Sequence, residues 1–227
     1  MKIVNFVKVL LFTCSILGFI IFLMYRPIHW PLALESGLCF IVSVLFLAIL
    51  IAFSRFQNKW IDKVQHANIL FGLLIGLLWS VEISINNFIQ PGLPDRDIID
   101  NVFWIIITIL LLIKISIDSY KSKSLISGLK AGLWTGFASG LVACTTAMLV
   151  IVFFDDSIIK DPLNIKEWND LNATTFTKDI SVYFAFQTYA GALLHFYILG
   201  MIFGLFFGII GGIIGIGLNF IFSKKLK

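Results

Sequence analysis

The chain of 227 residues is 59% hydrophobic and 15% aromatic, and only 13% of its residues are charged. This composition leaves too little polar surface to cover a water-soluble globule, so it indicates an integral membrane protein. The net charge of +4 comes from basic residues scattered in short turns rather than gathered in one patch, so nucleic acid is not an expected partner.

Six apolar runs are each long enough to cross a bilayer, which takes about 20 mostly apolar residues. They lie at 4–25, 32–54, 67–90, 101–120, 129–154 and 198–222. The predicted fold is all-α, a polytopic transmembrane helical bundle of about six spans that forms a single integral membrane domain over 1–227. The first run has no small-residue cleavage site before Arg26, so we interpret it as an uncleaved anchor.

The distribution of basic residues predicts the orientation, because positively charged flanks resist translocation. With the N-terminus inside, the inner side holds twelve of the 17 basic residues: Lys2, Lys8, Arg55, Lys59, Lys63, Lys114, Lys121, Lys123, Lys130, Lys224, Lys225 and Lys227. The outer side holds Arg26, Arg96, Lys160, Lys166 and Lys178, together with most of the acidic residues. We therefore expect both termini in the cytoplasm and the protein in the plasma (cytoplasmic) membrane, in contact with lipid headgroups.

The inner connection between the second and third runs, Ser54–His66, has an amphipathic pattern. Phe56, Trp60 and Val64 recur at helical spacing, and Arg55, Lys59 and Lys63 follow four apart on a neighbouring face. The pattern predicts a short helix along the membrane surface. Two interpretations stay open: interfacial anchoring, or an inner coupling helix built on Lys59, Trp60 and Lys63 that contacts a separate cytoplasmic ATPase subunit.

Glu82 in the third run is the costliest residue for the bilayer, since a central carboxylate costs about 2.5–3.5 kcal/mol even on insertion-based scales. Asn86 lies one turn further on the same face, next to Asn87. Similar depths are expected for Glu35, Thr145, Thr146, Gln187 and His195. Either these residues form interhelical hydrogen bonds, or they line an outward-open polar cavity in which Glu82 binds a cation or carries a proton, with His195 as a relay.

The acidic outer loop, 155–181, contains a helix-like piece from Leu163 to Leu171 that we expect on the membrane surface. It is either a plain linker or a lid or partner-docking element. The stretch from Val182 to Tyr197 together with the last run is too long for one span, so we expect a re-entrant or surface-lying segment there.

Gly200, Gly204, Gly208 and Gly212 recur every four residues in the last run and predict a helix-packing face. Its partner is another span of the chain, a second copy in a homo-oligomer, or a pore. The cysteines Cys14, Cys39 and Cys144 all fall inside apolar runs without metal-ligand spacing. No P-loop, HExxH or zinc motif occurs, so we expect no catalytic residues, metal or cofactor.

In layout the chain is similar to the membrane subunits of ABC-2-type exporters, which have six spans, both ends inside, an inner surface helix after span two and a long outer segment before span six. This resemblance implies a permease component for a small or lipid-like substrate. The alternative function is a non-transporting membrane scaffold, sensor or immunity protein that binds its partner through the glycine face or the outer loop.

Overall fold

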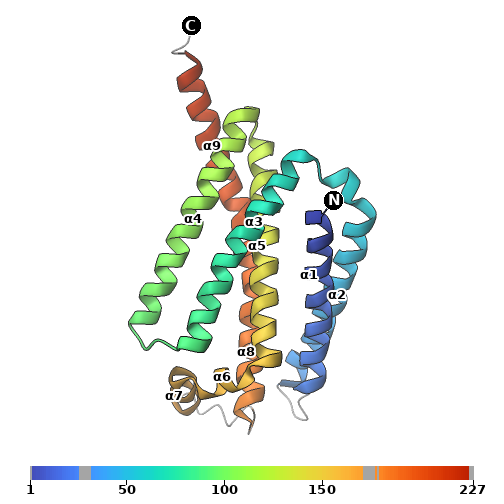
Figure 1. The fold of residues 1–227 in the computed structure, drawn as a ribbon, viewed down its shortest axis with the longest axis vertical. Coiled ribbons are helices and arrows are strands. Elements are labelled where there is room, and N and C mark those ends of the chain that lie inside the picture. Colours follow the sequence, from blue (N-terminus) through green and yellow to red (C-terminus); the bar gives the residue numbers. More distant parts are fainter. Residues whose placement is uncertain (1, 26–31, 171–176, 178, 225–227) are drawn as a thin grey trace.

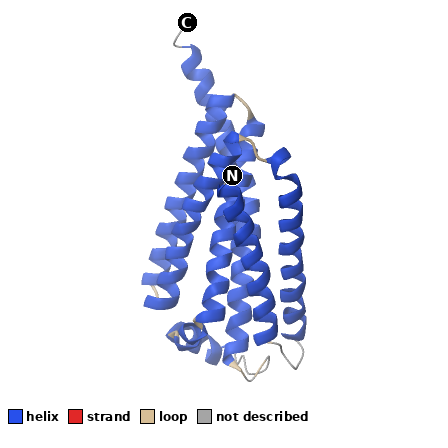
Figure 2. Ribbon diagram, turned by 45° about the vertical axis from the view of Figure 1, so that its right-hand side comes forward, coloured by secondary structure: helices blue, strands red, loops and turns tan. Residues whose placement is uncertain are grey.

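The computed structural model describes residues 2–25, 32–170, 177 and 179–224 (Figure 1). Every regular element in these residues is a helix, as Figure 2 shows. The elements are α1 (Lys2–Met24), α2 (Leu32–Trp60), α3 (Lys63–Ser84), the π-helical η1 (Ile85–Ile89), α4 (Asp95–Ser122), α5 (Leu125–Phe153), α6 (Asp155–Lys160), α7 (Pro162–Asp170), α8 (Ile180–Leu194), the π-helical η3 (His195–Ile202) and α9 (Phe203–Lys224).

Six helical segments of the described residues are long and apolar enough to cross a membrane. They are Ile3–Met24, Gly37–Gln57, Lys63–Ile89, Asp95–Ser122, Leu125–Phe153 and Ile180–Ser223. The prediction of an all-α bundle of about six spans is thereby confirmed, and the chain is a multi-pass integral membrane protein. The start of α1 and the end of α9 lie toward the same end of the bundle, which we call the inner end after the basic-residue pattern (Figure 1).

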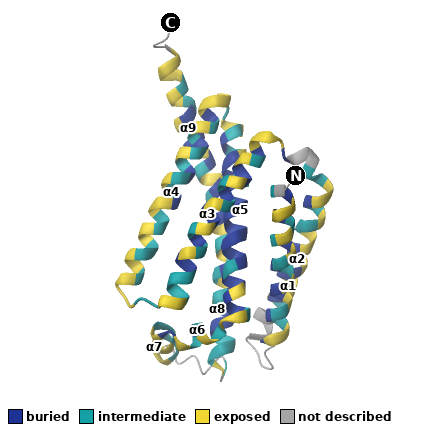
Figure 3. Ribbon diagram, in the orientation of Figure 1, coloured by how far each residue is buried: buried dark blue, intermediate teal, exposed yellow. Residues whose placement is uncertain are grey.

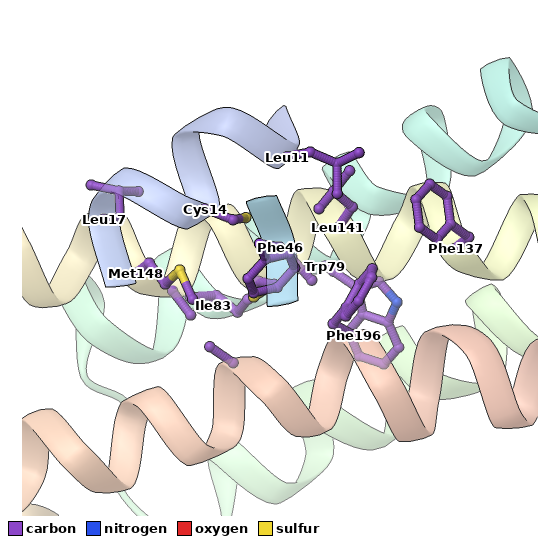
Figure 4. Close-up of a cluster of buried hydrophobic side chains, with 14 of the residues drawn as sticks. Leu11, Cys14, Leu17, Phe46, Trp79, Ile83, Phe137, Leu141, Met148 and Phe196 are labelled. Carbon is purple, nitrogen blue, oxygen red and sulfur yellow. The ribbon is translucent and has the colours of Figure 1, made fainter. Parts of the chain in front are cut away.

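Helix α5 is the centre of the bundle, and it is buried along most of its length, whereas α4 exposes much of its surface (Figure 3). Side chains from α1, α2, α3 and η3 converge on it, including Cys14, Phe46, Trp79 and Phe196 (Figure 4). Its small residues let several helices approach closely, and in lipid close approach is the main source of helix association.

The glycines of α9 and η3 lie against a second row of glycines on α5. A Cβ atom added to Gly204 would lie 2.6 Å from the carbonyl oxygen of Gly132, and one added to Gly140 would lie 2.8 Å from the carbonyl oxygen of His195. Real Cβ atoms essentially never come this close to another heavy atom. The two backbones are therefore in direct contact, and the glycine face of the last span packs inside the chain.

The expected re-entrant or surface-lying segment at 182–197 is not found. Helices α8, η3 and α9 instead follow one another without a break from Ile180 to Lys224, and the inner end of α9 projects beyond its neighbours (Figure 1). A continuous helix satisfies its own backbone hydrogen bonds, so the extra length needs no irregular backbone in the membrane.

The predicted surface helix over Ser54–His66 is also absent as a separate element. Residues up to Trp60 continue α2, and α3 begins at Lys63 after Asp62, whose carboxylate accepts from the backbone N–H groups of Val64 and Gln65. This N-cap starts α3 directly after Asp62, so only Ile61 and Asp62 connect the two helices. The side chains of Lys59 and Trp60 lie outside the described part of the structure.

Candidate functional site

An outer polar cluster joins α3 to α4 in the outer half of the bundle. The Asn86 side-chain amide donates from Nδ2 to both Oε1 of Glu82, at 2.7 Å, and Oδ1 of Asp100, at 2.8 Å. Glu82 and Asn86 are one helical turn apart, and the short connection between η1 and α4 brings Asp100 opposite them. One amide thus bridges two carboxyl groups, and Glu82 is only 8% exposed.

The cluster leaves several buried polar atoms unsatisfied. Oε2 of Glu82, Oδ1 of Asn86 and Nε of Arg96 have no hydrogen-bond partner among the described residues. Buried polar atoms normally have partners, and an unpaired one costs about 1–3 kcal/mol. The unpaired carboxyl oxygen of Glu82 and the unpaired amide oxygen of Asn86 lie next to Asp100, and together they form a site that favours a bound positive charge.

Arg96 supplies the one basic side chain in direct contact with this cluster among the described residues. Its Nη2 donates to the backbone oxygen of Asn86 at 3.1 Å and to Oδ2 of Asp161 at 2.7 Å. The guanidinium thus pairs with Asp161, whereas the Glu82 and Asp100 carboxyl groups are joined through the neutral Asn86 amide. If all three carboxyl groups were ionised, the group would carry a net charge of −2, so it attracts protons or cations.

The same ion pair ties the outer helices α6 and α7 to the span helices. The side chains of Arg96 and Asp161 are 18% and 6% exposed. Tyr25 makes a second tie, since its hydroxyl lies 3.3 Å from the Ile151 carbonyl and 3.4 Å from Oδ2 of Asp155. Burial and the Asp155 carboxylate raise the pKa of Tyr25 to about 12, so the hydroxyl remains a donor at neutral pH.

We predict that Arg96→Gln destabilises the attachment of α7, because it leaves the buried Asp161 carboxylate without its counter-charge. A loss of about 3 kcal/mol is expected for such a pair. Limited proteolysis within Pro162–Asp170 should become faster, and the double variant with Asp161→Asn should recover part of the protection. Lys160→Gln is the matched control, since its ion pair with Asp156 is exposed and contributes little. Equal cleavage of Arg96→Gln and wild type would contradict the prediction.

An aromatic layer lies directly inward of the outer polar cluster. The Trp79 ring meets Trp104 of α4 at 4.9 Å and His195 of η3 at 5.2 Å, both edge to face, and Trp104 also meets Phe203 at 6.3 Å. Nδ1 of His195 lies 2.9 Å from the Gly191 carbonyl oxygen. A carbonyl can only accept, so Nδ1 carries the hydrogen, and Nε2 is the acceptor of the neutral ring.

An inner polar cluster lies on the same two helices beyond the aromatic layer. Lys114 of α4 donates to Oδ1 of Asn68 on α3 and, at 2.5 Å, to Oδ2 of Asp118. Thr135 of α5 donates to the backbone oxygen of Asn68 at 3.3 Å. Nδ2 of the fully buried Asn68 has no partner among the described residues.

The outer and inner polar clusters are separated by the same number of residues on α3 as on α4. Glu82 and Asn68 are 14 residues apart on α3, and Asp100 and Lys114 are 14 apart on α4, which corresponds to roughly 21 Å on each helix. This is about two thirds of a hydrocarbon core of about 30 Å. Each half of the bundle thus contains one polar cluster on the same two helices, with the aromatic layer between the clusters.

The structure brings together only some of the predicted polar residues. Glu82 and Asn86 are joined, and His195 reaches the adjacent aromatic layer, but Asn87 turns back to the Ile83 carbonyl. Thr145 instead bonds the Cys14 sulfur, and the exposed Gln187 bonds Glu167. The side chain of Glu35 lies outside the described part of the structure.

The sequence pattern does not reveal several residues of the two polar clusters. Arg96 and Asp100 precede the apolar run that starts at 101 and so look like residues of an outer loop, whereas α4 begins at Asp95. Lys114 looks like one of the inner basic residues by its sequence position, although it lies well inside α4. Its partner Asp118 follows at i+4 within an apolar run, and this spacing was a usable signal for a paired charge.

The three cysteines are buried thiols, and no group of three or more His, Cys, Asp or Glu side chains in the described residues could hold a metal ion. Comparisons of the chain with protein-family models, with curated proteins and with solved structures find no match. The function is therefore argued from the site itself.

Proposed function

We propose that the chain is a proton-coupled permease component for a small or lipid-like substrate. In this proposal, Glu82 in the outer polar cluster takes up the proton from the outer side. The alternative, a non-transporting scaffold or sensor, requires no exchange of protons at this position. The observation that carries the proposal is the carboxyl pair of Glu82 and Asp100, which one Asn86 amide bridges and in which Oε2 of Glu82 is left unpaired.

The charge balance of the outer cluster supports proton binding. Two neighbouring carboxylates repel one another, and one bound positive charge relieves this repulsion. Ionisable residues inside a span are costly and commonly mark ion or proton pathways. Arg96 is already engaged by Asp161, so it does not neutralise the pair fully. A proton on Glu82 would also give its unpaired Oε2 atom the capacity to donate.

The arrangement along α3 and α4 supports movement of a substrate rather than static binding. A carrier needs a polar site reachable from each side and a barrier between them. The outer cluster, the aromatic layer and the inner cluster provide these three parts in order. The π-helical segments η1 and η3 adjoin the outer cluster and the aromatic layer, and such segments occur frequently at functional sites.

The packing of α9 and the course of α2 bear on the partners of the proposed permease. The face of Gly200, Gly204, Gly208 and Gly212 is filled by α5, so it gives no support to a homo-oligomer built on that face. Residues 54–60 continue α2 and supply no separate coupling helix for a cytoplasmic ATPase subunit. We therefore propose coupling to the proton gradient rather than to ATP hydrolysis.

The proposal can be tested without knowing the substrate, by measuring charge displacement on a solid-supported membrane. Proteoliposomes are exposed to a rapid acid jump, and proton binding within the membrane gives a transient current. We expect the current with wild type and its loss with Glu82→Gln. Glu167→Gln is the control, because this half-buried carboxylate of α7 pairs with Gln187 and lies outside the cluster. Equal currents from Glu82→Gln and wild type, or none from wild type, would favour the scaffold or sensor.

A further inference from the structure

A second candidate site lies in the inner half of the bundle, away from both polar clusters. A cavity of about 530 Å³ opens between α2, α5 and η3. Its lining includes Ile49 and Phe53 of α2, Lys130, Trp134 and Phe137 of α5, and Met201 of η3. This volume lies within the roughly 300–1,000 Å³ typical of small-molecule sites.

The cavity exists because α2 packs chiefly on α1 and leaves a space beside α5. Three aromatic rings bridge that space: Phe53 meets Trp134 at 6.2 Å and Phe137 at 6.3 Å, and Trp134 meets Phe137 at 5.9 Å. These contacts give the cavity a rigid aromatic wall. An apolar ligand chain would contact fixed rings there, at little cost in side-chain entropy.

The polarity of the cavity changes with depth. Lys130 is exposed and is the one charged side chain among the described lining residues. Lys130 lies near the inner end of α5, which begins at Leu125. Phe137 follows Lys130 by seven residues along the helix and is therefore about 10 Å deeper in the bundle. A cationic mouth above an apolar interior is complementary to an amphiphile with an anionic head and a hydrocarbon tail.

We propose that this inner pocket binds an anionic phospholipid of the cytoplasmic leaflet. Its headgroup would pair with the Lys130 ammonium, and one acyl chain would lie against Phe53, Trp134 and Phe137. Charge complementarity selects an anionic lipid over a zwitterionic one, because a basic side chain at the surface attracts anionic headgroups. This binding site is independent of proton uptake at Glu82 and stands whether or not the chain transports.

Quenching of tryptophan fluorescence by brominated lipids tests the proposal. The protein is reconstituted in vesicles that contain either brominated phosphatidylglycerol, which is anionic, or brominated phosphatidylcholine, which is zwitterionic. Trp134→Phe, measured in parallel, isolates the signal of Trp134 from that of the other tryptophans. We expect Trp134 to be quenched preferentially by the anionic lipid, and Lys130→Gln to reduce this preference about five-fold.

The matched control is Lys121→Gln, which removes one exposed positive charge from the inner end of α4, away from the cavity. It should leave the preference unchanged, so a general loss of surface charge can be separated from the loss of the site. Equal quenching of Trp134 by the two lipids would overturn the proposal. So would the absence of quenching by either lipid, which would mean that protein, for example a second copy of the chain, fills the cavity.

Discussion

Replacing Gly204 and Gly208 together by leucine should abolish the folded protein. An added Cβ at Gly204 would lie 2.6 Å from the Gly132 carbonyl oxygen, and one at Gly208 would lie 3.0 Å from the Leu129 Cα atom. These neighbours are backbone atoms of α5, which cannot rotate away as a flexible side chain would. Overpacking of a core typically costs about 1–3 kcal/mol for each site, and forcing two helix backbones apart also removes the contacts that drive association in lipid.

Gly217 provides the control on the same helix. It is exposed, and among the described atoms nothing lies within 4 Å of the position of an added Cβ. We expect Gly217→Leu to give wild-type yield, a monodisperse elution profile in mild detergent and an unchanged Tm. The double variant should give little monodisperse protein. A normal yield and a normal Tm for Gly204→Leu/Gly208→Leu would contradict the assigned contact between α5 and α9.

The second large effect is expected at the inner polar cluster. Lys114→Met should destabilise the protein by about 3 kcal/mol, because it leaves the half-buried Asp118 carboxylate without a counter-charge. The side chains of this pair are only 18% and 13% exposed, so little solvent screening is available. Asn68 would lose the ammonium that its side-chain oxygen now accepts from.

The double variant Lys114→Met/Asp118→Asn distinguishes a charge effect from a packing effect. It removes both charges, so it should lose less stability than Lys114→Met alone. Lys121→Met is the control for the loss of an exposed cation and should change stability by no more than about 0.5 kcal/mol. Thermal unfolding in detergent measures all three. A Lys114→Met variant as stable as Lys121→Met would show that the ion pair of Lys114 and Asp118 contributes nothing.

The spans and their packing surface were predictable because they depend on local composition. Apolar run length decides which segments cross the bilayer, and the spacing of Gly200 to Gly212 identified a close-packing face. The identity of the partner was left open between another span, a second copy and a pore. The partner is α5, because its own row of glycines from Gly128 to Gly140 faces the row on η3 and α9. Whether two such rows face each other depends on how the helices are arranged, and the pattern of one helix alone does not determine this.

Only some members of the polar clusters are predictable from the sequence, because each cluster joins residues of two different helices. The cost of a carboxylate in a span singled out Glu82, but its neighbour Asp100 comes from another helix, and no local pattern pairs them. The continuous helix from Ile180 to Lys224 is longer than the bilayer is thick, so a prediction from span length alone divides it into two segments. A helix that satisfies its own backbone can extend past the bilayer at little cost, so length alone did not require a break.

Accessibility of position 82 from the outer side tests the central claim most directly. A static helix contact at Glu82 would stay closed, whereas a permease must open it to water. The variant Glu82→Cys is treated with a membrane-impermeant thiol reagent added outside, and Met148→Cys, fully buried in the apolar core of α5, serves as the control. The native cysteines are buried and should give a low background. We predict rapid modification at position 82 and none at 148; equal protection of both positions would contradict the permease.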